Sequence, residues 1–503
     1  MSSIRKLAGQ TLWYGASNIG ARFLNYLLTP LITYLLHNPE GVKDYGDYSL
    51  LYAWIAVANI VFTYGFETGF FRFCNKEGTD TKTIFETTFG SIVLSTIGLV
   101  AVLMALRGPI TQFIGLEQHT EYISWVALLI GLDALSAIPF AQLRQQERPR
   151  KYALIKLSGI VMNILWTVFF LVVLPRYLHA HPAHWLAPWY QHNTAVGFLI
   201  LANLLQNLLV FLLLFGEWKM FRFRINARLW KQIFRYSAPI IFIGIAAMIN
   251  EVMDRQMLDM FLPLPGDAAK RVVGIYSANY KLAILISLFI QAFKMAAEPF
   301  FFNQARDKNA PQTYARVMTW FVITMGLAFL FTALYLDLWK YFIGTAYRSG
   351  LSIVPILLGA NICLGIYYNL SIWYKLTDRM MAGLYITLLG VVLTLAINYL
   401  FIPRWGMYAA AWATFCCYAA MMVAAYLLGQ RYFPVPYEVR KCTAYLAFML
   451  ALYFIHSGIQ LMTTIAGIRL FAATILIGLY LFFVFIMERN QLKGLPVVGK
   501  WVR

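Results

Sequence analysis

Residues 250–255 read Asn-Glu-Val-Met-Asp-Arg and lie inside an apolar segment, residues 237–262, that is long enough to cross a bilayer. Glu251, Asp254 and Arg255 are spaced i, i+3 and i+4, so on a helix they project within an arc of roughly 100°. Ionised side chains near the bilayer centre cost on the order of 2.5–3.5 kcal/mol each, and they normally face a bundle interior or a water-filled cavity. The pattern predicts a functional site on this helix. The alternative is a structural ion pair of Glu251 with Arg255, although Asp254 leaves that group with unbalanced charge.

The whole chain has the composition of a membrane protein. It has 503 residues, of which 60% are hydrophobic and only 13% are charged, whereas a soluble domain carries about twice that charged fraction. Apolar windows of ~20 residues recur along the chain, beginning at residues 12–36, and they predict about fourteen membrane-spanning helices. The predicted fold class is therefore an all-α polytopic membrane protein.

The formal net charge of +19 could indicate a nucleic-acid partner, but the positions of the basic residues argue against one. Loops on the side of the N-terminus hold roughly three times as many Lys and Arg residues as the opposite loops, which is the positive-inside pattern. We therefore expect both termini in the cytoplasm and the basic loops in contact with anionic lipids. The five cysteines include no C-x-x-C pair, so a disulfide framework is not expected.

An internal repeat relates the two halves of the chain. The pattern Gly-x-Tyr-Ser-x-x-Tyr begins at Gly46 and again at Gly274, an offset of 228 residues. The same offset relates Leu-Pro-Arg at residues 174–176 to Ile-Pro-Arg at residues 402–404. Matches in one order and register indicate a duplication, with chance resemblance among apolar helices as the alternative. Because each repeat holds six predicted spans, the two lobes should share one orientation, related by an axis along the membrane normal.

The repeat also predicts the domain organisation. We expect a six-helix N-terminal lobe at residues 1–215, a basic cytoplasmic connector at 216–235, a six-helix C-terminal lobe at 236–430, and two additional helices with a cytoplasmic tail at 431–503. In this register the helix with the charged triplet corresponds to the first helix, which carries Arg22. Equivalent helices of two lobes should face a common cleft.

Charged residues in other spans add to the predicted site. Arg22 lies near the middle of the first span, too deep to reach either surface easily, so it should meet water, an anion or a carboxylate. Arg22, Arg255 and Lys281 outweigh the acidic Glu251 and Asp254 near mid-membrane. A cleft with that balance attracts a phosphate or pyrophosphate, for which arginine offers bidentate hydrogen bonds. Further charged residues in spans or at their ends are Glu67, Lys156, Lys294 and Glu298.

Other motifs give little support to catalysis or to cofactor binding. His179, His181 and His184 lie close together in an outer loop, but no nearby acid or thiol joins them, so we expect no metal ion there. The chain has no Walker A loop, Gly-x-Ser-x-Gly elbow or His-Glu-x-x-His motif, so ATP hydrolysis and hydrolase chemistry have no support. The main alternative is a membrane transferase that acts on a lipid-linked sugar. Such an enzyme should have an outer loop large enough to form an acceptor site, but no predicted outer loop exceeds roughly twenty residues. We therefore expect a transporter, with no cofactor and no catalytic residue.

The overall plan and one late motif resemble a known family. Two six-helix halves are followed by two spans, an arginine lies in the first helix, and the turn Ile-Pro-Arg-Trp-Gly at residues 402–406 precedes three alanines at 409–411. Together these features resemble the polysaccharide-exporter branch, of the Wzx type, of the multidrug, oligosaccharidyl-lipid and polysaccharide (MOP) transporter superfamily. The resemblance covers essentially the whole chain, and it lies in the architecture more than in any single motif.

The resemblance implies a flippase. Such a protein carries an undecaprenyl-diphosphate-linked oligosaccharide, a polysaccharide or O-antigen precursor, across the bacterial inner membrane by alternating access. It implies that Arg22 and Arg255 hold the diphosphate with help from Lys281. Charge tuning or ion coupling would fall to Glu251, Asp254 and Glu67. The implied partners are the lipid-linked oligosaccharide, membrane lipids, Na+ or H+ as a coupling ion, and a polysaccharide polymerase with glycosyltransferases.

Two other branches of the superfamily are alternatives. The lipid II flippase of peptidoglycan synthesis shares the fourteen-span plan. A multidrug or cation antiporter fits less well, because that branch generally has twelve spans. In addition, a cation-exporting cavity should carry net acid, whereas the predicted cleft leans basic.

Overall fold

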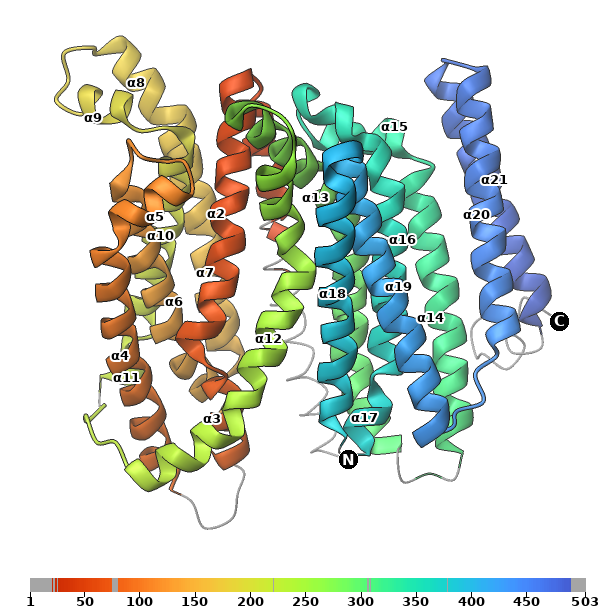
Figure 1. The fold of residues 1–503 in the computed structure, drawn as a ribbon, viewed down its shortest axis with the longest axis horizontal. Coiled ribbons are helices and arrows are strands. Elements are labelled where there is room, and N and C mark those ends of the chain that lie inside the picture. Colours follow the sequence, from red (N-terminus) through yellow and green to blue (C-terminus); the bar gives the residue numbers. More distant parts are fainter. Residues whose placement is uncertain are drawn as a thin grey trace. The chain divides into compact units, whose positions relative to one another are not determined.

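The computed structural model describes residues 20, 23–24, 26–74, 80–219, 221–304, 307, 309–377 and 379–489. Every regular element in those ranges is helical (Figure 1). Thirteen of the described helices are long and apolar enough to cross a membrane, so the predicted all-α polytopic fold is confirmed. Of the predicted first span, residues 12–36, the structure describes residues 20, 23–24 and 26–36, which include the short apolar helix Tyr26–Leu35.

The chain divides into two compact units, unit 1 (Met1–Gly274) and unit 2 (Ile275–Arg503). The helices of unit 1 are α2 (Pro39–Thr63), α3 (Phe66–Cys74), α4 (Thr81–Ala105), α5 (Arg107–Phe113), α6 (Thr120–Gln145), α7 (Pro149–Val168), the π-helical η1 (Phe169–Val173), α8 (Leu174–Ala180), α9 (Ala187–His192), α10 (Ala195–Leu213), α11 (Phe215–Trp218) and α12 (Ala227–Phe261). Helix α13 (Gly266–Gln304) begins in unit 1 and continues into unit 2. The predicted domain boundaries near residues 215, 235 and 430 follow the repeat rather than this division, and they stay a prediction.

The remaining helices belong to unit 2. They are α14 (Ala310–Ala333), α15 (Leu336–Trp339), the 3-10 helices η2 (Lys340–Phe342) and η3 (Thr345–Ile353), α16 (Val354–Leu370), α17 (Ile372–Leu376), α18 (Met380–Trp405), α19 (Met407–Tyr432), α20 (Val439–Met462) and α21 (Ala466–Met487). Helix α19 packs against α16 and α18, while α14 packs against α16, α20 and α21. The two trailing helices α20 and α21 lie side by side (Figure 1).

A break divides the second predicted span into α2 and α3. Tyr64 and Gly65 adopt φ angles of 33° and 71°, in the left-handed region that ends many helices. A side chain at position 65 would contact Ile240 of α12, so the space and the backbone both favour glycine there. Helix α3 then starts one residue later and carries Glu67 in its first turn. The break therefore sets the position of this acidic residue.

Helix α6 is the central helix of unit 1. It packs against α2, α4, α7 and α10. Its residues Tyr122, Ala134 and Ile138 are completely buried, as are Phe66 and Phe70 of α3 in the same apolar core. A polar group on such a helix must find a partner or water, because lipid and packed apolar side chains offer neither.

A reciprocal contact within unit 1 joins Gly46 and Gly274, the glycines that begin the two repeated motifs. A Cβ added to Gly46 would collide with the carbonyl oxygen of Lys270, and one added to Gly274 would collide with that of Val42. Residues 42 and 270 differ by 228, as do residues 46 and 274. Two equivalent segments related by a two-fold axis make such mutual contacts. The contact therefore supports the register of the predicted repeat.

Candidate functional site

Unit 1 contains a cavity of about 360 Å³ among its membrane-spanning helices. Helices α2, α3, α6, α7 and α12 contribute its lining, which consists of Ala56, Asn59, Ile60, Thr63, Glu67, Asp133, Ala137, Phe140, Arg144, Tyr152, Lys156 and Met248. Two basic and two acidic side chains are among them. We call this space the charged cavity. Ionisable groups at membrane depth are rare and normally mark functional sites, so it is the leading candidate in unit 1.

Asp133 and Asn59 form a polar contact between α6 and α2 on the cavity wall. The amide nitrogen Nδ2 of Asn59 donates a hydrogen bond of 2.5 Å to Oδ2 of Asp133. The amide oxygen Oδ1 of Asn59 is buried, and it has no hydrogen-bond partner among the described residues. Buried polar groups are usually satisfied by protein or water, so this oxygen is a place for a bound water molecule.

Arg144 and Glu67 form an ion pair between α6 and α3. The guanidinium also lies over the ring of Phe71, 4.8 Å from its centroid, and near Tyr152 at 5.8 Å. Its Nε is buried without a hydrogen-bond partner among the described residues. The aromatic contacts hold the guanidinium plane in place beside the cavity that Arg144 lines.

Lys156 adds a second cation, from α7. Its ammonium lies 4.6 Å from the centroid of the Phe140 ring. A ring face attracts a cation without neutralising it. The net result is a membrane cavity in which two cations and two carboxylates face one space.

The charged triplet on α12 occupies three different environments. The Asp254 side chain is 2% exposed and pairs with the Arg255 guanidinium at 3.2 Å. The same guanidinium nitrogen donates to the backbone carbonyl oxygen of Glu251 at 3.0 Å, and the Glu251 side chain is exposed. The 12% exposure of the Arg255 side chain leaves little of it accessible. This ion pair joins neighbours at i and i+1; the i and i+4 pair of Glu251 with Arg255 stays a prediction.

The other predicted residues are distributed as follows. Arg22 lies outside the described residues. Lys281 is half-buried on the part of α13 that belongs to unit 2, whereas Arg255 and Glu67 belong to unit 1. Among the predicted site residues that the structure describes in unit 1, Glu67 alone lines the charged cavity.

Sequence reasoning missed the central acid of the cavity. Asp133 lies in the middle of a predicted span at residues 122–143, so its depth carried the same signal that singled out Asp254. Arg144 lies just beyond that span, among the basic residues expected in the loops on the cytoplasmic side. Only the helix packing shows that both face the same space as Lys156.

Unit 2 has a cavity of different character. It measures about 220 Å³ and lies among α14, α16, α19, α20 and the segment before α20. Its lining is Met318, Val322, Ile366, Leu370, Met422, Val423, Tyr426, Tyr437, Val439, Cys442, Thr443 and Leu446, with no charged side chain among them. We call it the apolar cavity. Its surface suits a hydrocarbon chain.

The fold matches solved structures of membrane transporters. The lipid II flippase MurJ in an inward closed conformation aligns with a TM-score of 0.68 at 12% identity, covering 95% of this chain and 99% of that one. An inward-facing multidrug resistance MATE family transporter of the MOP superfamily aligns with a TM-score of 0.53 at 14% identity, covering 83% and 92%. A mutant of the Vibrio cholerae MATE transporter VcmN gives 0.52 at 12% identity, covering 86% and 98%. The protein is thus a multi-pass membrane protein with the fold shared by MurJ and the MATE transporters.

The sequence identifies the family. A family model described as polysaccharide biosynthesis protein matches residues 7–305, which is more than half of the chain, so the chain belongs to that family. No curated protein gives a significant match. The family and the fold together support membership of the MOP superfamily.

Proposed function

We propose that this protein is a flippase of the polysaccharide-exporter branch, and that it carries an undecaprenyl-diphosphate-linked oligosaccharide across the bacterial inner membrane by alternating access. The observation that carries the proposal is the charged cavity, found among membrane-spanning helices of a chain from the polysaccharide biosynthesis family. A membrane cavity with oriented cations and partly unsatisfied polar atoms suits a head group that combines phosphates with sugar hydroxyls.

Two cations of the charged cavity are assigned to the diphosphate. Arg144 is already oriented by its contacts with Phe71 and Glu67. The Lys156 ammonium lies over an aromatic ring and keeps its full charge for a phosphate oxygen. When a diphosphate approaches, Arg144 can pair with a phosphate oxygen in place of the Glu67 carboxylate, because the Glu67 side chain is 43% exposed and can turn to water.

Residues chosen from the sequence keep their roles in the proposal. Arg22 and Arg255 hold the diphosphate in at least one state of the transport cycle, and Lys281 assists. Asp254 holds the Arg255 guanidinium at 3.2 Å, so it tunes that arginine. Glu251, Glu67 and Asp133 are carboxylates that can take up a coupling ion, Na+ or H+.

The apolar cavity of unit 2 is assigned to the polyprenyl chain. The described residues of its lining combine aliphatic side chains with Tyr426 and Tyr437 and include no charged group. Burying a hydrocarbon chain against such a surface is worth ~25 cal/mol per Å² where it replaces water. Against lipid, the gain comes from packing contacts instead.

The topology completes the proposal. Both termini lie in the cytoplasm, where basic loops are retained. A polysaccharide polymerase and glycosyltransferases are the expected partners, since they would consume and supply the lipid-linked oligosaccharide. The chain itself needs neither a cofactor nor catalytic residues for this role.

Lipid II is the second candidate substrate. The specific observation in its favour is the fold likeness to the lipid II flippase MurJ, with a TM-score of 0.68 over 95% of this chain. Lipid II also carries a diphosphate and a polyprenyl chain, so both cavities would serve it equally. The sugar portion distinguishes the two substrates.

Reconstitution into liposomes tests the proposal. Fluorescent undecaprenyl-diphosphate oligosaccharide and fluorescent lipid II are placed in one leaflet, and their arrival in the other is followed for wild type, Arg22→Ala and Arg255→Ala. We expect wild type to transfer the oligosaccharide lipid and both variants to lose at least about tenfold in rate, as expected for a lost charged hydrogen bond. Transfer of lipid II alone would establish the second candidate, and transfer of neither lipid would contradict a flippase.

A further inference from the structure

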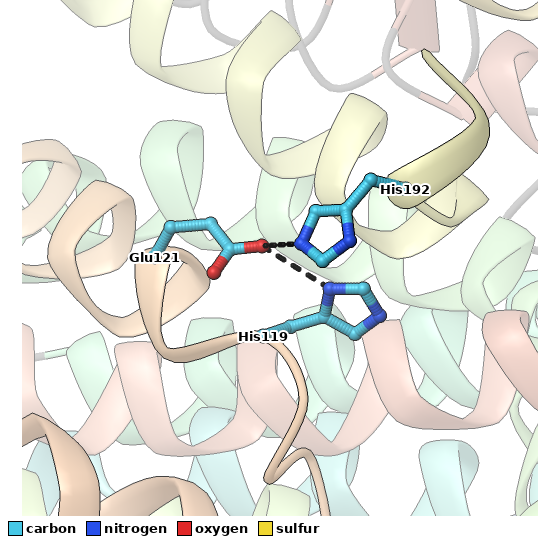
Figure 2. A group of neighbouring side chains, drawn as sticks. All are labelled: His119, Glu121 and His192. Atoms are coloured by element: carbon cyan, nitrogen blue, oxygen red, sulfur yellow. Dashed lines mark hydrogen bonds and ion pairs between the residues drawn. The ribbon is translucent and has the colours of Figure 1, made fainter. Parts of the chain in front are cut away.

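Three metal-ligating side chains meet at one end of unit 1, outside both cavities. His119 precedes α6, Glu121 lies in its first turn, and His192 is the last residue of α9 (Figure 2). Oε1 of Glu121 lies 3.1 Å from Nδ1 of His119 and 3.5 Å from Nε2 of His192. All three ligand atoms lie within 4.8 Å of one another.

These distances suit one ion held by three ligands. Zinc–ligand bonds of about 2.0–2.1 Å place neighbouring ligand atoms of a tetrahedron ~3.3–3.4 Å apart. Two of the three edges are already close to that length. The His192 side chain is 60% exposed and can turn to shorten the third edge without disturbing a packed core.

The surroundings hold two of the ligands in place. The His119 ring stacks on the Tyr122 ring with an interplanar angle of 3° and a centroid distance of 4.5 Å. The Tyr122 hydroxyl in turn accepts a hydrogen bond of 2.9 Å from the backbone N–H of Thr194. Gly197 allows this approach, because a Cβ there would collide with the Tyr122 ring. The segment that carries His192 is thereby fastened over the start of α6.

The geometry points to a binding site for a divalent transition-metal ion of the Zn²⁺ type, formed by His119, Glu121 and His192. Two imidazole nitrogens and one carboxylate oxygen are the ligands that Zn²⁺ prefers after thiolates, and a water molecule would complete a four-coordinate sphere. The ion would fasten the end of α9 to the start of α6. The outer-loop histidines His179, His181 and His184 are not part of this site. Glu121 of α6 supplies its acidic ligand.

Metal binding to the full-length protein, purified in detergent without a polyhistidine tag, tests the inference. After treatment with a chelator, Zn²⁺ binding is measured by equilibrium dialysis, and Co²⁺ is used as a probe whose visible absorption reports its coordination. We expect one tightly bound ion in wild type and in the control His179→Ala, an exposed histidine outside the cluster. Glu121→Gln and His192→Ala should each weaken binding by more than about 100-fold.

Two results would overturn the inference. One is an absence of stoichiometric Zn²⁺ binding by correctly folded wild type. The other is unchanged affinity and unchanged Co²⁺ absorption in Glu121→Gln, which keeps the shape of the side chain. The proposed flippase activity is not needed for this experiment, so the two proposals fail or succeed separately.

Discussion

One polar helix contact occurs in both units with different chemistry. In unit 1, Asn59 of α2 bonds to Asp133 of α6 at 2.5 Å. In unit 2, Ser287 of α13 donates to the amide oxygen of Asn361 on α16 at 2.9 Å. Positions 59 and 287 differ by 228, as do 133 and 361, so the two contacts are equivalent in the repeat. The repeat keeps the position of the contact, while only unit 1 places an ionisable group there.

The surroundings of the two contacts differ in the same sense. Asp133 lines the charged cavity, whereas Asn361 is 3% exposed and also donates to the carbonyl oxygen of Leu357 at 2.9 Å. The unit 2 contact is thus a closed structural hydrogen bond. Equivalent positions of the repeat therefore line a cavity in unit 1 and form a packing contact in unit 2.

The largest expected effect comes from exchanging the two chemistries. In wild type the Asn361 amide nitrogen donates to backbone carbonyl oxygens. Asn361→Asp replaces this donor with an ionised carboxylate, which the same carbonyl oxygens repel. We expect a loss of about 3 kcal/mol in unfolding free energy, because a buried charge without a cation is strongly destabilising. Thermal and denaturant unfolding of the purified protein measure it. The matched variant Asp133→Asn should cost less than about 1 kcal/mol, and equal costs would remove the distinction between the contacts.

A second substitution tests the repeat register itself. Gly46→Ala and Gly274→Ala each push a methyl group into a carbonyl oxygen of the facing helix. Each should therefore lower stability by about 2 kcal/mol, within the usual range for overpacking. Gly98→Ala on α4 is the control, because nothing lies within 4 Å of its added Cβ. It should be neutral or slightly stabilising, and a loss equal to that of Gly46→Ala would argue against the contact.

Filling the apolar cavity tests its assignment to the polyprenyl chain. Val423→Trp occupies part of the 220 Å³ space, so the affinity for a polyprenyl diphosphate should fall about fivefold, or ~1 kcal/mol. Affinity for a short-chain diphosphate analogue should stay unchanged. Val392→Trp, at a position of α18 that is 62% exposed and outside this cavity, is the control. Equal losses for long and short chains would contradict the assignment.

The smallest effect concerns a charged contact at the edge of unit 2. Burial alone raises the pKa of Asp337, but hydrogen bonds and charges from Lys340 and Arg469 outweigh it and hold the pKa below its usual value. Because the folded-state pKa is lowered, the contact stabilises fully above the unfolded pKa of about 3.9 and is lost as pH falls through the folded value.

The size of that contribution is well below about 1 kcal/mol, since the contact lies near the surface. We expect wild type to exceed Asp337→Asn in unfolding free energy by a constant amount between about pH 5 and 7. The difference should then shrink below about pH 4. A difference that persists undiminished at pH 3 would show that Asp337 acts through its shape rather than its charge.

Much of the fold was predictable because membrane spans leave a strong signal. Apolar length predicted the all-α polytopic class, and the thirteen described spans confirm it. The offset of 228 between Gly46 and Gly274 predicted a repeat, and their reciprocal contact supports that register. Apolar length could not predict the break at Tyr64 and Gly65, because the hydropathy of the segment continues through it.

The charged cavity was less predictable because it depends on packing between distant segments. A charged residue in the middle of a predicted span indicates a functional site, and this signal applies to Asp133 as it does to Glu251. The pairing of Glu67 with Arg144 joins residues 77 positions apart, on helices whose rotation no single-sequence pattern gives. The assignments of Arg22, Arg255 and Lys281 stay predictions.

The central claim is that the cations of the charged cavity bind the diphosphate of the substrate. Substituting Lys156 is the cleanest test, because it leaves the ion pair between Arg144 and Glu67 intact. Substituting Arg144 would break that pair. Lys294 is a matched control: it lies 4.5 Å over the ring of Tyr368 in unit 2, and Tyr368 is the repeat equivalent of Phe140 beneath Lys156.

The decisive measurement is the initial rate at which proteoliposomes transfer a fluorescent undecaprenyl-diphosphate oligosaccharide, for Lys156→Gln against Lys294→Gln. We predict a fall of about tenfold or more for Lys156→Gln, equivalent to the loss of one charge-assisted hydrogen bond, and a rate near wild type for Lys294→Gln. Equal rates for the two variants, with both correctly folded, would contradict the assignment of the diphosphate to the charged cavity.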